Sequence, residues 1–152
     1  MSQQPPQSPF VIVAGFGIPG REVVNLLEAN SIEFVVVELN PQTVERCGRG
    51  GLNIVQGDVT EEPVLRAAGI DRATMIAIAI PDDPAVLKTI DLCRRLNPAV
   101  RILARCRRVS TGMEAARRGA HDVVSEEQLI GAEFARLTLP LISQSQMQSQ
   151  LR

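Results

Sequence analysis

Short apolar runs alternate with segments of helical periodicity along most of the chain. The apolar runs predict six β-strands, at residues 10–14, 33–38, 53–56, 74–80, 100–105 and 122–124. Between and after them, apolar residues recur at helical spacing, which predicts helices over residues 18–29, 41 to about 48, 61–68, about 83–96, 111–118 and 126–137. This alternation predicts an α/β fold, a Rossmann-like, doubly wound six-stranded parallel sheet in a single domain.

Local signals mark where these elements and the domain begin and end. Asn40 and Thr60 each precede a predicted helix, and their side-chain oxygens are expected to cap its first turn. Residues 1–9 show no apolar periodicity and are predicted to be a flexible leader. Residues 141–152 form a polar, low-complexity tail, and a segment of that composition cannot build a core of its own. The folded domain is therefore expected over residues 10–140.

A glycine motif follows the first predicted strand, in the pattern Gly15-x-Gly17-x-x-Gly20. The first glycine permits a tight turn, the second lets the backbone approach a pyrophosphate, and the third allows close packing of helix on strand. Pro19 is compatible with this pattern because a first-turn N–H has no intrahelical acceptor to lose. A lone motif of this kind also marks ordinary strand-to-helix turns, so its context decides its meaning.

Glu38 supplies that context at the end of the second predicted strand. It lies at the distance from Gly15 where dinucleotide-binding folds place an acidic residue. A carboxylate there accepts hydrogen bonds from ribose hydroxyls and repels a 2′-phosphate. The alternative is a solvated charge at a strand end, but the spacing favours a nucleotide site near the first strand.

Other polar side chains follow the remaining strands, and their carboxyl ends should meet at one edge of the sheet. Asp58 either contacts an adenine amino group or makes an Asx-turn. Arg105 either binds phosphate oxygens or forms an ion pair with a nearby acid. Asp82 and Asp83 are predicted to cap the next helix.

The charge and aromatic content argue against a nucleic-acid partner. The chain has 152 residues with 16 basic and 17 acidic side chains, a formal net charge of −1, so no global field attracts nucleic acid. Its aromatic residues are four Phe, with no Trp or Tyr, which leaves few platforms for stacking bases.

Cysteine and histidine usage argues against a metal or catalytic centre. Cys47, Cys93 and Cys106 lie far apart and are expected to be reduced thiols in a cytosolic compartment. His121, the single histidine, is predicted to be an ordinary surface residue. Apolar runs such as residues 75–80 are far shorter than the roughly 20 residues that a membrane span needs, so no direct membrane insertion is expected.

Six motifs of the chain lie at residues 11–20, 35–40, 57–60, 68–70, 102–105 and 119–126. Together they resemble the regulator-of-potassium-conductance domain, also called the Trk-A N-terminal domain. Particularly similar are the versions at the C-terminal end of Kef-type cation/proton antiporters. Members gate potassium channels, Trk-type uptake systems and efflux antiporters by binding NAD(H), ATP, ADP or AMP.

The resemblance implies a role for each of these motifs. Gly15, Phe16, Gly17, Ile18 and Pro19 would form the phosphate loop. The adenosine ribose would be held by Glu38, the adenine would lie between Asp58 and Val59, and Arg105 would lie near the phosphates or the second ribose. Family domains also pair as homodimers, through the helices after the fourth and fifth strands.

The resulting hypothesis is a cytoplasmic, non-enzymatic switch at the inner face of the cell membrane, bound to a membrane-embedded cation transporter or channel. A small NAD-dependent oxidoreductase is the alternative. Against it, the chain has no Tyr for the Tyr-x-x-x-Lys pair of short-chain dehydrogenases, and its single Lys is Lys88 within a predicted helix. A third possibility is a scaffold that binds nothing, against which the intact glycines and Glu38 argue.

Overall fold

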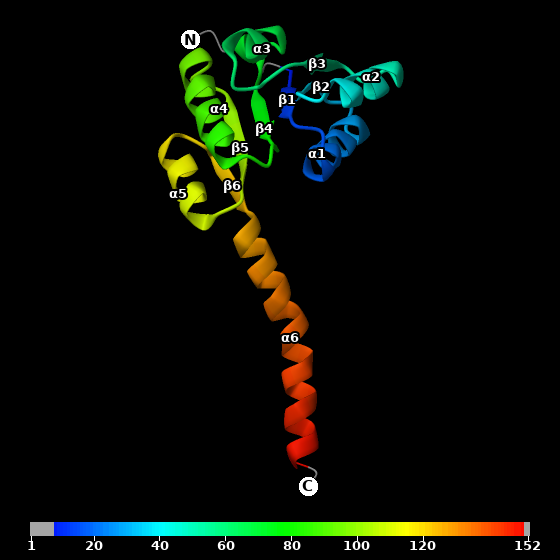
Figure 1. The fold of residues 1–152 in the computed structure, drawn as a ribbon, viewed down its shortest axis with the longest axis vertical. Helices are drawn as coiled ribbons and strands as arrows, with labels where there is room; N and C mark the ends of the chain where they lie inside the picture. The colour runs from blue at the N-terminus through cyan, green and yellow to red at the C-terminus, as the bar shows by residue number, and fades with distance from the viewer. Residues whose placement is uncertain (1–7, 151–152) are drawn as a thin grey trace, which may run out of the picture.

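Six parallel strands form one sheet in the computed structural model, which describes residues 8–150 (Figure 1). Their order is β3-β2-β1-β4-β5-β6. Strands β2 and β3 therefore lie on one side of β1, and the chain crosses to the other side of β1 before β4. This confirms the doubly wound fold expected from the sequence and places the topological switch point beside β1. The strands are β1 Phe10–Ala14, β2 Glu33–Glu38, β3 Ile54–Gln56, β4 Met75–Ile78, β5 Arg101–Cys106 and β6 Asp122–Ser125.

Helices follow each strand, close to the positions that the apolar periodicity predicts. Two starts differ. Helix α5 begins at Val109, two residues before the expected start, and the residue before α3 is Glu61, so that Thr60 does not cap this helix as expected. The N–H and hydroxyl of Thr60 instead both donate to the Asp58 carboxylate. The helices are α1 Ile18–Ala29, α2 Pro41–Arg49, α3 Glu62–Ala67, α4 Asp83–Leu96, α5 Val109–Arg117 and α6 Glu126–Gln150, with a short 3-10 turn, η1, at Ile70–Arg72.

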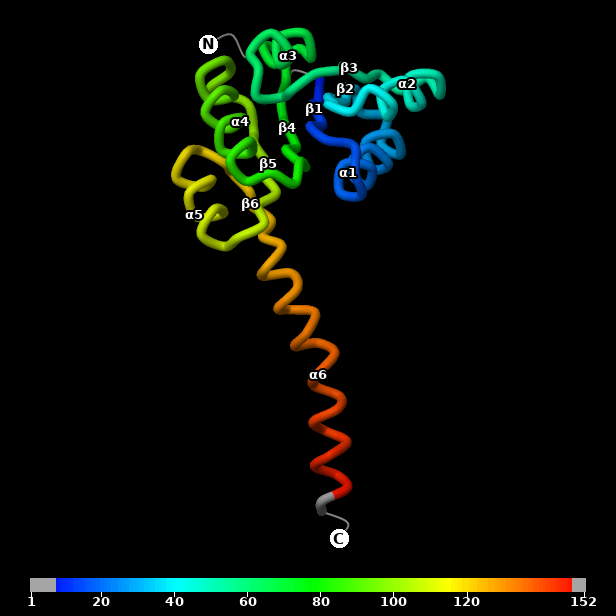
Figure 2. Tube along the Cα trace, viewed as in Figure 1, coloured from blue at the N-terminus to red at the C-terminus, as the bar shows by residue number. Residues whose placement is uncertain are grey.

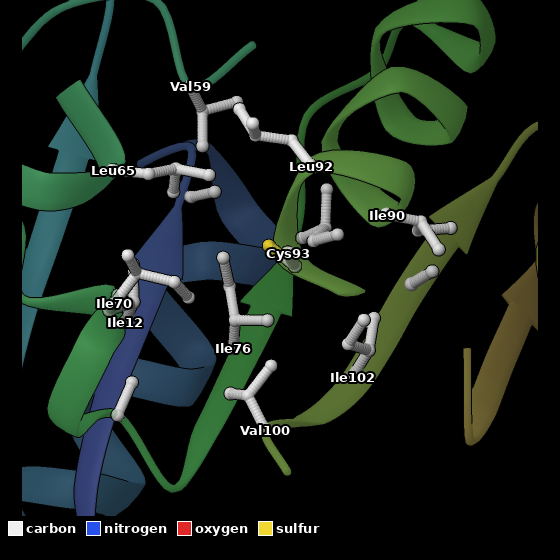
Figure 3. Close-up of a cluster of buried hydrophobic side chains, with 14 of the residues drawn as sticks. Ile12, Val59, Leu65, Ile70, Ile76, Ile90, Leu92, Cys93, Val100 and Ile102 are labelled. Carbon is white, nitrogen blue, oxygen red and sulfur yellow. The ribbon is translucent and has the colours of Figure 1, made fainter. Parts of the chain in front are cut away.

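The larger core lies between the sheet and the layer formed by α3, α4 and α5. Ile12, Ile76 and Ile102 come from three neighbouring strands and face Ile90 and Cys93 of α4 (Figure 3). All five side chains are fully buried. Their packing fixes the central strands and, with them, the edge of the sheet at which the strands end.

The opposite face of the sheet is covered over only part of its width. Val11, Val13 and Val36 pack there against Val24 and Leu27 of α1, and α2 contacts β2 and β3. Over β4, β5 and β6 the same face borders an open apolar cleft of about 540 Å³. Among the cleft's lining residues are Val23 of α1, Leu103 of β5, and Leu129 and Ile130 of α6.

The start of α1 packs unusually close to the turn that follows β1. A Cβ built on Gly20 would lie 2.0 Å from the carbonyl oxygen of Gly15 and 3.0 Å from its carbonyl carbon. Only a glycine fits there without moving the backbone, as expected for the third glycine of the motif. This contact sets the position of the helix N-terminus relative to the sheet.

The last helix is longer than the sequence predicts. Its expected end at about Leu137 is wrong, because α6 runs through Pro140 to Gln150 and includes most of the segment expected to be a polar tail. Proline removes one backbone donor, but the surrounding turns stay helical. Figure 2 shows α6 leading away from the sheet, and its side chains from Glu127 to Gln148 are exposed.

The helix nevertheless does not resemble a membrane segment. Within residues 8–150, none of the helices combines the length and the hydropathy that crossing a bilayer requires. Most of the expected leader, residues 1–7, and the last two residues of the expected tail lie outside the described residues.

The Gly15–Gly20 contact leads to a test of stability. Gly20→Ala should lower the free energy of unfolding by about 3 kcal/mol, because the new methyl group overlaps a backbone oxygen that cannot move independently. Gly131→Ala is the matched control, since it is also a helical glycine but has nothing within 4 Å of the new methyl group. Urea titrations followed by circular dichroism measure both, and equal stabilities for the two variants would contradict the packing.

Candidate functional site

A crevice of about 410 Å³ opens at the carboxyl ends of β1, β2 and β4. The segments after β1, β2, β3 and β4 meet there with Arg105 of β5, as the doubly wound topology requires. Its lining brings together most of the residues singled out in the sequence and adds a short apolar wall from the segment after β4. The lining residues are Gly15, Phe16, Gly17, Val37, Glu38, Leu39, Gly57, Asp58, Val59, Ala79, Ile80, Pro81, Asp82, Ala85 and Arg105.

The glycine loop leaves the N-terminus of α1 open toward this crevice. Gly15 turns the chain with φ +95° and donates its N–H to the carbonyl of Val37 at 2.8 Å. Gly17 is the N-cap of α1, and among residues 8–150 no side chain caps the first turn. At the start of α2, by contrast, the Asn40 side chain accepts from the backbone N–H of Gln42. The first-turn donors of α1 and the positive end of its dipole are therefore available to an anion.

Gly17 also has free space where a side chain would be. A Cβ at this position would meet nothing within 4 Å, and its backbone conformation, φ −77°, is open to any residue. The absence of a side chain is thus not needed for folding. It leaves the backbone accessible from the crevice, which is what close approach of a phosphate requires.

Glu38 joins the glycine loop to the end of β2. Its carboxylate accepts one hydrogen bond from the backbone N–H of Phe16 and another from that of Asn40, each at 2.9 Å. One oxygen thus holds the phosphate-loop candidate and the other holds the loop that leads to α2. Because a carboxylate has about four acceptor positions, acceptor capacity remains for the hydroxyls of a ribose.

Two aspartates of the crevice have defined structural roles. Asp58 makes the Asx-turn, because its Oδ1 accepts the backbone N–H of Thr60 at 2.9 Å and the Thr60 hydroxyl at 2.7 Å. The backbone N–H and then the hydroxyl of Thr60 hold the pKa of Asp58 below its usual value. Asp82 caps α4 as predicted, accepting the N–H of Ala85 at 2.8 Å. Both carboxylates still face the crevice.

Asp83 lies in the first turn of α4 and does not cap that helix. It accepts the backbone N–H of Arg107 at 2.8 Å and thereby ties α4 to the loop after β5. Burial opposes its ionisation, but that N–H, together with the Thr111 side chain and the N–H of Arg108, keeps the pKa of Asp83 below its usual value.

Arg105 forms the ion pair that was one of its two predicted roles. Its Nε donates to Glu126 Oε1 at 2.6 Å, and its Nη1 donates to the carbonyl oxygen of Ala79 at 3.2 Å. The guanidinium still lines the crevice. Glu126 was not identified as a partner from the sequence, although an acid that opens the helix after the next strand was a usable signal.

The remaining predicted site residues take different positions. Val59 lines the crevice but is buried in the larger core, so packing is its main observed role. Ile18 is 80% exposed and is not among the lining residues, whereas Pro19 lines the neighbouring apolar cleft. Of the nine residues predicted to bind the ligand, Ile18 and Pro19 are therefore the two that do not line the crevice.

The other chemically notable side chains lie outside the crevice. Burial raises the pKa of the Cys93 thiol to about 12 and that of Cys106 to about 11. His121 is exposed and its Nδ1 accepts the N–H of Ile102 at 3.1 Å. Within residues 8–150 there is no group of three or more His, Cys, Asp or Glu side chains placed to hold a metal ion.

The geometry of the crevice matches one chemical task well. An open helix N-terminus, a carboxylate at the end of the second strand and an arginine across from them face a common space. These groups suit, in turn, a phosphate, a ribose and further phosphate oxygens. The apolar wall around Ile80 offers a surface for a flat base.

Comparison with known proteins identifies the family of the chain. The model of the TrkA-N domain family matches residues 11–126. The chain is also 35% identical, over 103 residues or 68% of its length, to the glutathione-regulated potassium-efflux system protein KefC of Cronobacter sakazakii. It spans 17% of the length of that relative.

Two solved structures show that the likeness extends to the fold. The TrkA-N domain of inner membrane protein ybaL from Escherichia coli matches with a TM-score of 0.80 and 25% identity, over 86% of this chain and 96% of that one. The Shewanella denitrificans Kef CTD in AMP-bound form matches with a TM-score of 0.72 and 25% identity, over 86% of this chain and 80% of that one. The resemblance inferred from the sequence motifs is confirmed, and the chain belongs to the TrkA-N domain family.

Proposed function

We propose that this chain is a nucleotide-sensing regulatory domain that binds an adenine nucleotide at the carboxyl ends of its strands. The observation that carries the proposal is the open N-terminus of α1, which faces the same crevice as the Glu38 carboxylate. The relative solved with AMP has the same fold, which supports the same class of ligand here. We assign this role to residues 10–140.

The proposed ligand is NAD(H) or an adenine mononucleotide, AMP, ADP or ATP. Glu38 favours any ligand whose adenosine ribose carries free hydroxyls, because its oxygens can accept from them. It disfavours NADP, because the 2′-phosphate would lie against a carboxylate already anchored by Phe16 and Asn40. The first turn of α1 and Arg105 would hold the phosphates.

The domain would act by a change of arrangement and not by catalysis. The crevice is lined by apolar side chains, carboxylates that bind backbone N–H groups, and one arginine, Arg105. The single lysine, Lys88, lies within α4. These groups do not form the acid–base pair that the alternative, a small NAD-dependent oxidoreductase, needs, so we favour a switch.

The proposed partner is a membrane-embedded cation transporter or channel, at the cytoplasmic face of the membrane. The potassium-efflux protein KefC and the inner membrane protein ybaL support this assignment. A ligand shifts such a system only if it binds one arrangement of the domains more tightly, at about 1.4 kcal/mol for each tenfold difference in affinity.

We also propose that the domain works as a homodimer. The apolar side chains exposed on α6 are the supporting observation, because a surface of this kind is characteristic of a contact site. They are Leu129, Ile130, Phe134, Leu137, Leu139, Leu141, Ile142 and Met147. The resemblance implies contacts through α4 and α5, but α5 exposes fewer large apolar residues, chiefly Met113.

Calorimetric titration tests the ligand assignment directly. Nucleotide-free protein should bind at least one of NAD⁺, NADH, AMP, ADP and ATP, and its affinity for NADP⁺ should be at least about tenfold lower than for NAD⁺ because of Glu38. A folded, nucleotide-free protein that binds none of them would contradict the proposed function.

Two substitutions test the site residues. Gly17→Val should abolish nucleotide binding without loss of the fold, because its side chain enters open space where the phosphates would lie. Glu38→Ala should weaken NAD⁺ and AMP alike, by about tenfold, because both carry the same ribose. Glu45→Ala, which removes an exposed carboxylate on α2, is the control. Unchanged affinity in both test variants would refute the site.

Light scattering coupled to gel filtration tests the dimer. The chain should elute as a dimer, and Phe134→Asp should convert it to a monomer by placing a charge on the apolar surface of α6. Met113→Asp on α5 is the comparison, since Met113 is 66% exposed and Phe134 70%. A monomeric wild-type chain would refute the homodimer, and dissociation by Met113→Asp alone would move the interface to α5.

A further inference from the structure

Arg105 lines both the crevice and the apolar cleft. The crevice also contains Glu38 and Asp58, and the apolar cleft also contains Glu126 and Leu129. Its side chain is 26% exposed, and that of Glu126 is 31% exposed. The residue therefore lies at the boundary between the proposed ligand site and the start of α6.

The contacts of Arg105 join the ends of β4 and β5 to the first residue of α6. The guanidinium binds Glu126 through Nε at 2.6 Å and also through Nη2. Nη1 donates to the carbonyl oxygen of Ala79, in the segment after β4. Glu126 directly follows β6 and is the residue at which α6 begins. A movement of this one guanidinium thus alters the support of the helix.

The charges around the crevice make this arginine decisive for a phosphate ligand. Glu38, Asp58 and Asp82 contribute three carboxylates to the lining. Arg105 is the only basic side chain among the lining residues in the described part of the chain. In this structure its charge is already compensated by Glu126. A phosphate entering the crevice must therefore compete with that carboxylate.

Carboxylate and phosphate are close competitors for a guanidinium. Arginine binds both through paired N–H groups with similar geometry. A phosphate carries more charge, so it can draw the guanidinium toward the crevice. The Glu126 carboxylate then loses its partner beside an apolar cleft.

The junction between β6 and α6 contains a buried polar group without a hydrogen-bond partner in the described part of the chain. Ser125, the last residue of β6, is buried, and its hydroxyl has no hydrogen-bond partner among residues 8–150. A buried hydroxyl without a partner costs stability. Among the described residues, the Ser125 side chain therefore adds no hydrogen bond to the start of α6.

We propose that the Arg105–Glu126 ion pair couples occupancy of the crevice to the position of α6. This rests on the proposed function, because it requires a phosphate in the crevice. The phosphate competes with Glu126 for Arg105, and the loss of the ion pair loosens the junction between β6 and α6. Coupling between two sites is reciprocal. A partner that holds α6 with the ion pair intact therefore weakens phosphate binding by the same factor by which phosphate weakens the binding of that partner.

Glu126→Gln tests the competition, because it keeps the size of the side chain and removes its charge. ADP affinity measured by calorimetry should rise by about fivefold, the gain for AMP should be smaller, and adenosine affinity should not change. This dependence on phosphate charge distinguishes competition from a structural role, which would change all three affinities alike. Glu126→Asp, which keeps the carboxylate on a shorter side chain, should also raise ADP affinity, but by less than Glu126→Gln does.

Glu133→Gln is the matched control. It makes the same change on the same helix, but Glu133 is exposed, pairs with Arg136 and is not among the residues that line the crevice. Its affinities for ADP, AMP and adenosine should equal those of the wild type.

Hydrogen exchange at the junction tests the coupling. ADP should accelerate exchange of the backbone amides of residues 125–130 in the wild type and in Glu133→Gln. In Glu126→Gln the faster exchange should be present without ligand, and ADP should add nothing.

The outcomes separate this inference from the proposed function. If the wild type binds ADP but Glu126→Gln leaves ADP affinity unchanged or weaker, or if ADP leaves the junction's exchange unchanged, the coupling is refuted and the nucleotide site stands. A wild type that binds none of the adenine nucleotides refutes both.

Discussion

The close contact between Gly20 and the carbonyl of Gly15 is the constraint on which the site depends. It brings the first turn of α1 against the end of β1, where a residue with a side chain would not fit. That approach directs the free N–H groups of the helix into the space between the ends of β1 and β2. Glu38 completes the arrangement by holding Phe16 of the same turn. The loop is therefore held in place by contacts within the chain.

A second constraint is electrostatic. The crevice has more carboxylates than cations, yet each carboxylate has a local role: Glu38 holds the glycine loop, Asp58 makes a turn and Asp82 caps α4. Their charges are thus partly offset by backbone N–H groups. Arg105 is offset by Glu126 instead, so its availability to a ligand depends on α6. Ligand binding and the attachment of α6 therefore share one side chain.

The exposed surface of α6 and the half-covered face of the sheet have a common origin. In a doubly wound fold, helices normally cover both faces. Here the helix after β6 leads away from the sheet (Figure 1), and the face over β4 to β6 borders an apolar cleft. Apolar residues are consequently left exposed on both sides of the junction at Glu126, which is where a change in the position of α6 would have the largest effect on contacts.

The sequence by itself determined the succession of strands and helices along the chain, the glycine turn and the acid at the end of β2. These features depend on residues close together in the chain, through apolar periodicity and backbone geometry. Local signals were less reliable at two places: Thr60 binds Asp58 and does not cap α3, and α6 continues past its expected end at about Leu137 to Gln150. Only the tertiary structure decided that Arg105 pairs with Glu126, 21 residues away, and that α6 stays exposed. Both depend on how β5, β6 and the following helix meet in space, which no local pattern of side chains specifies.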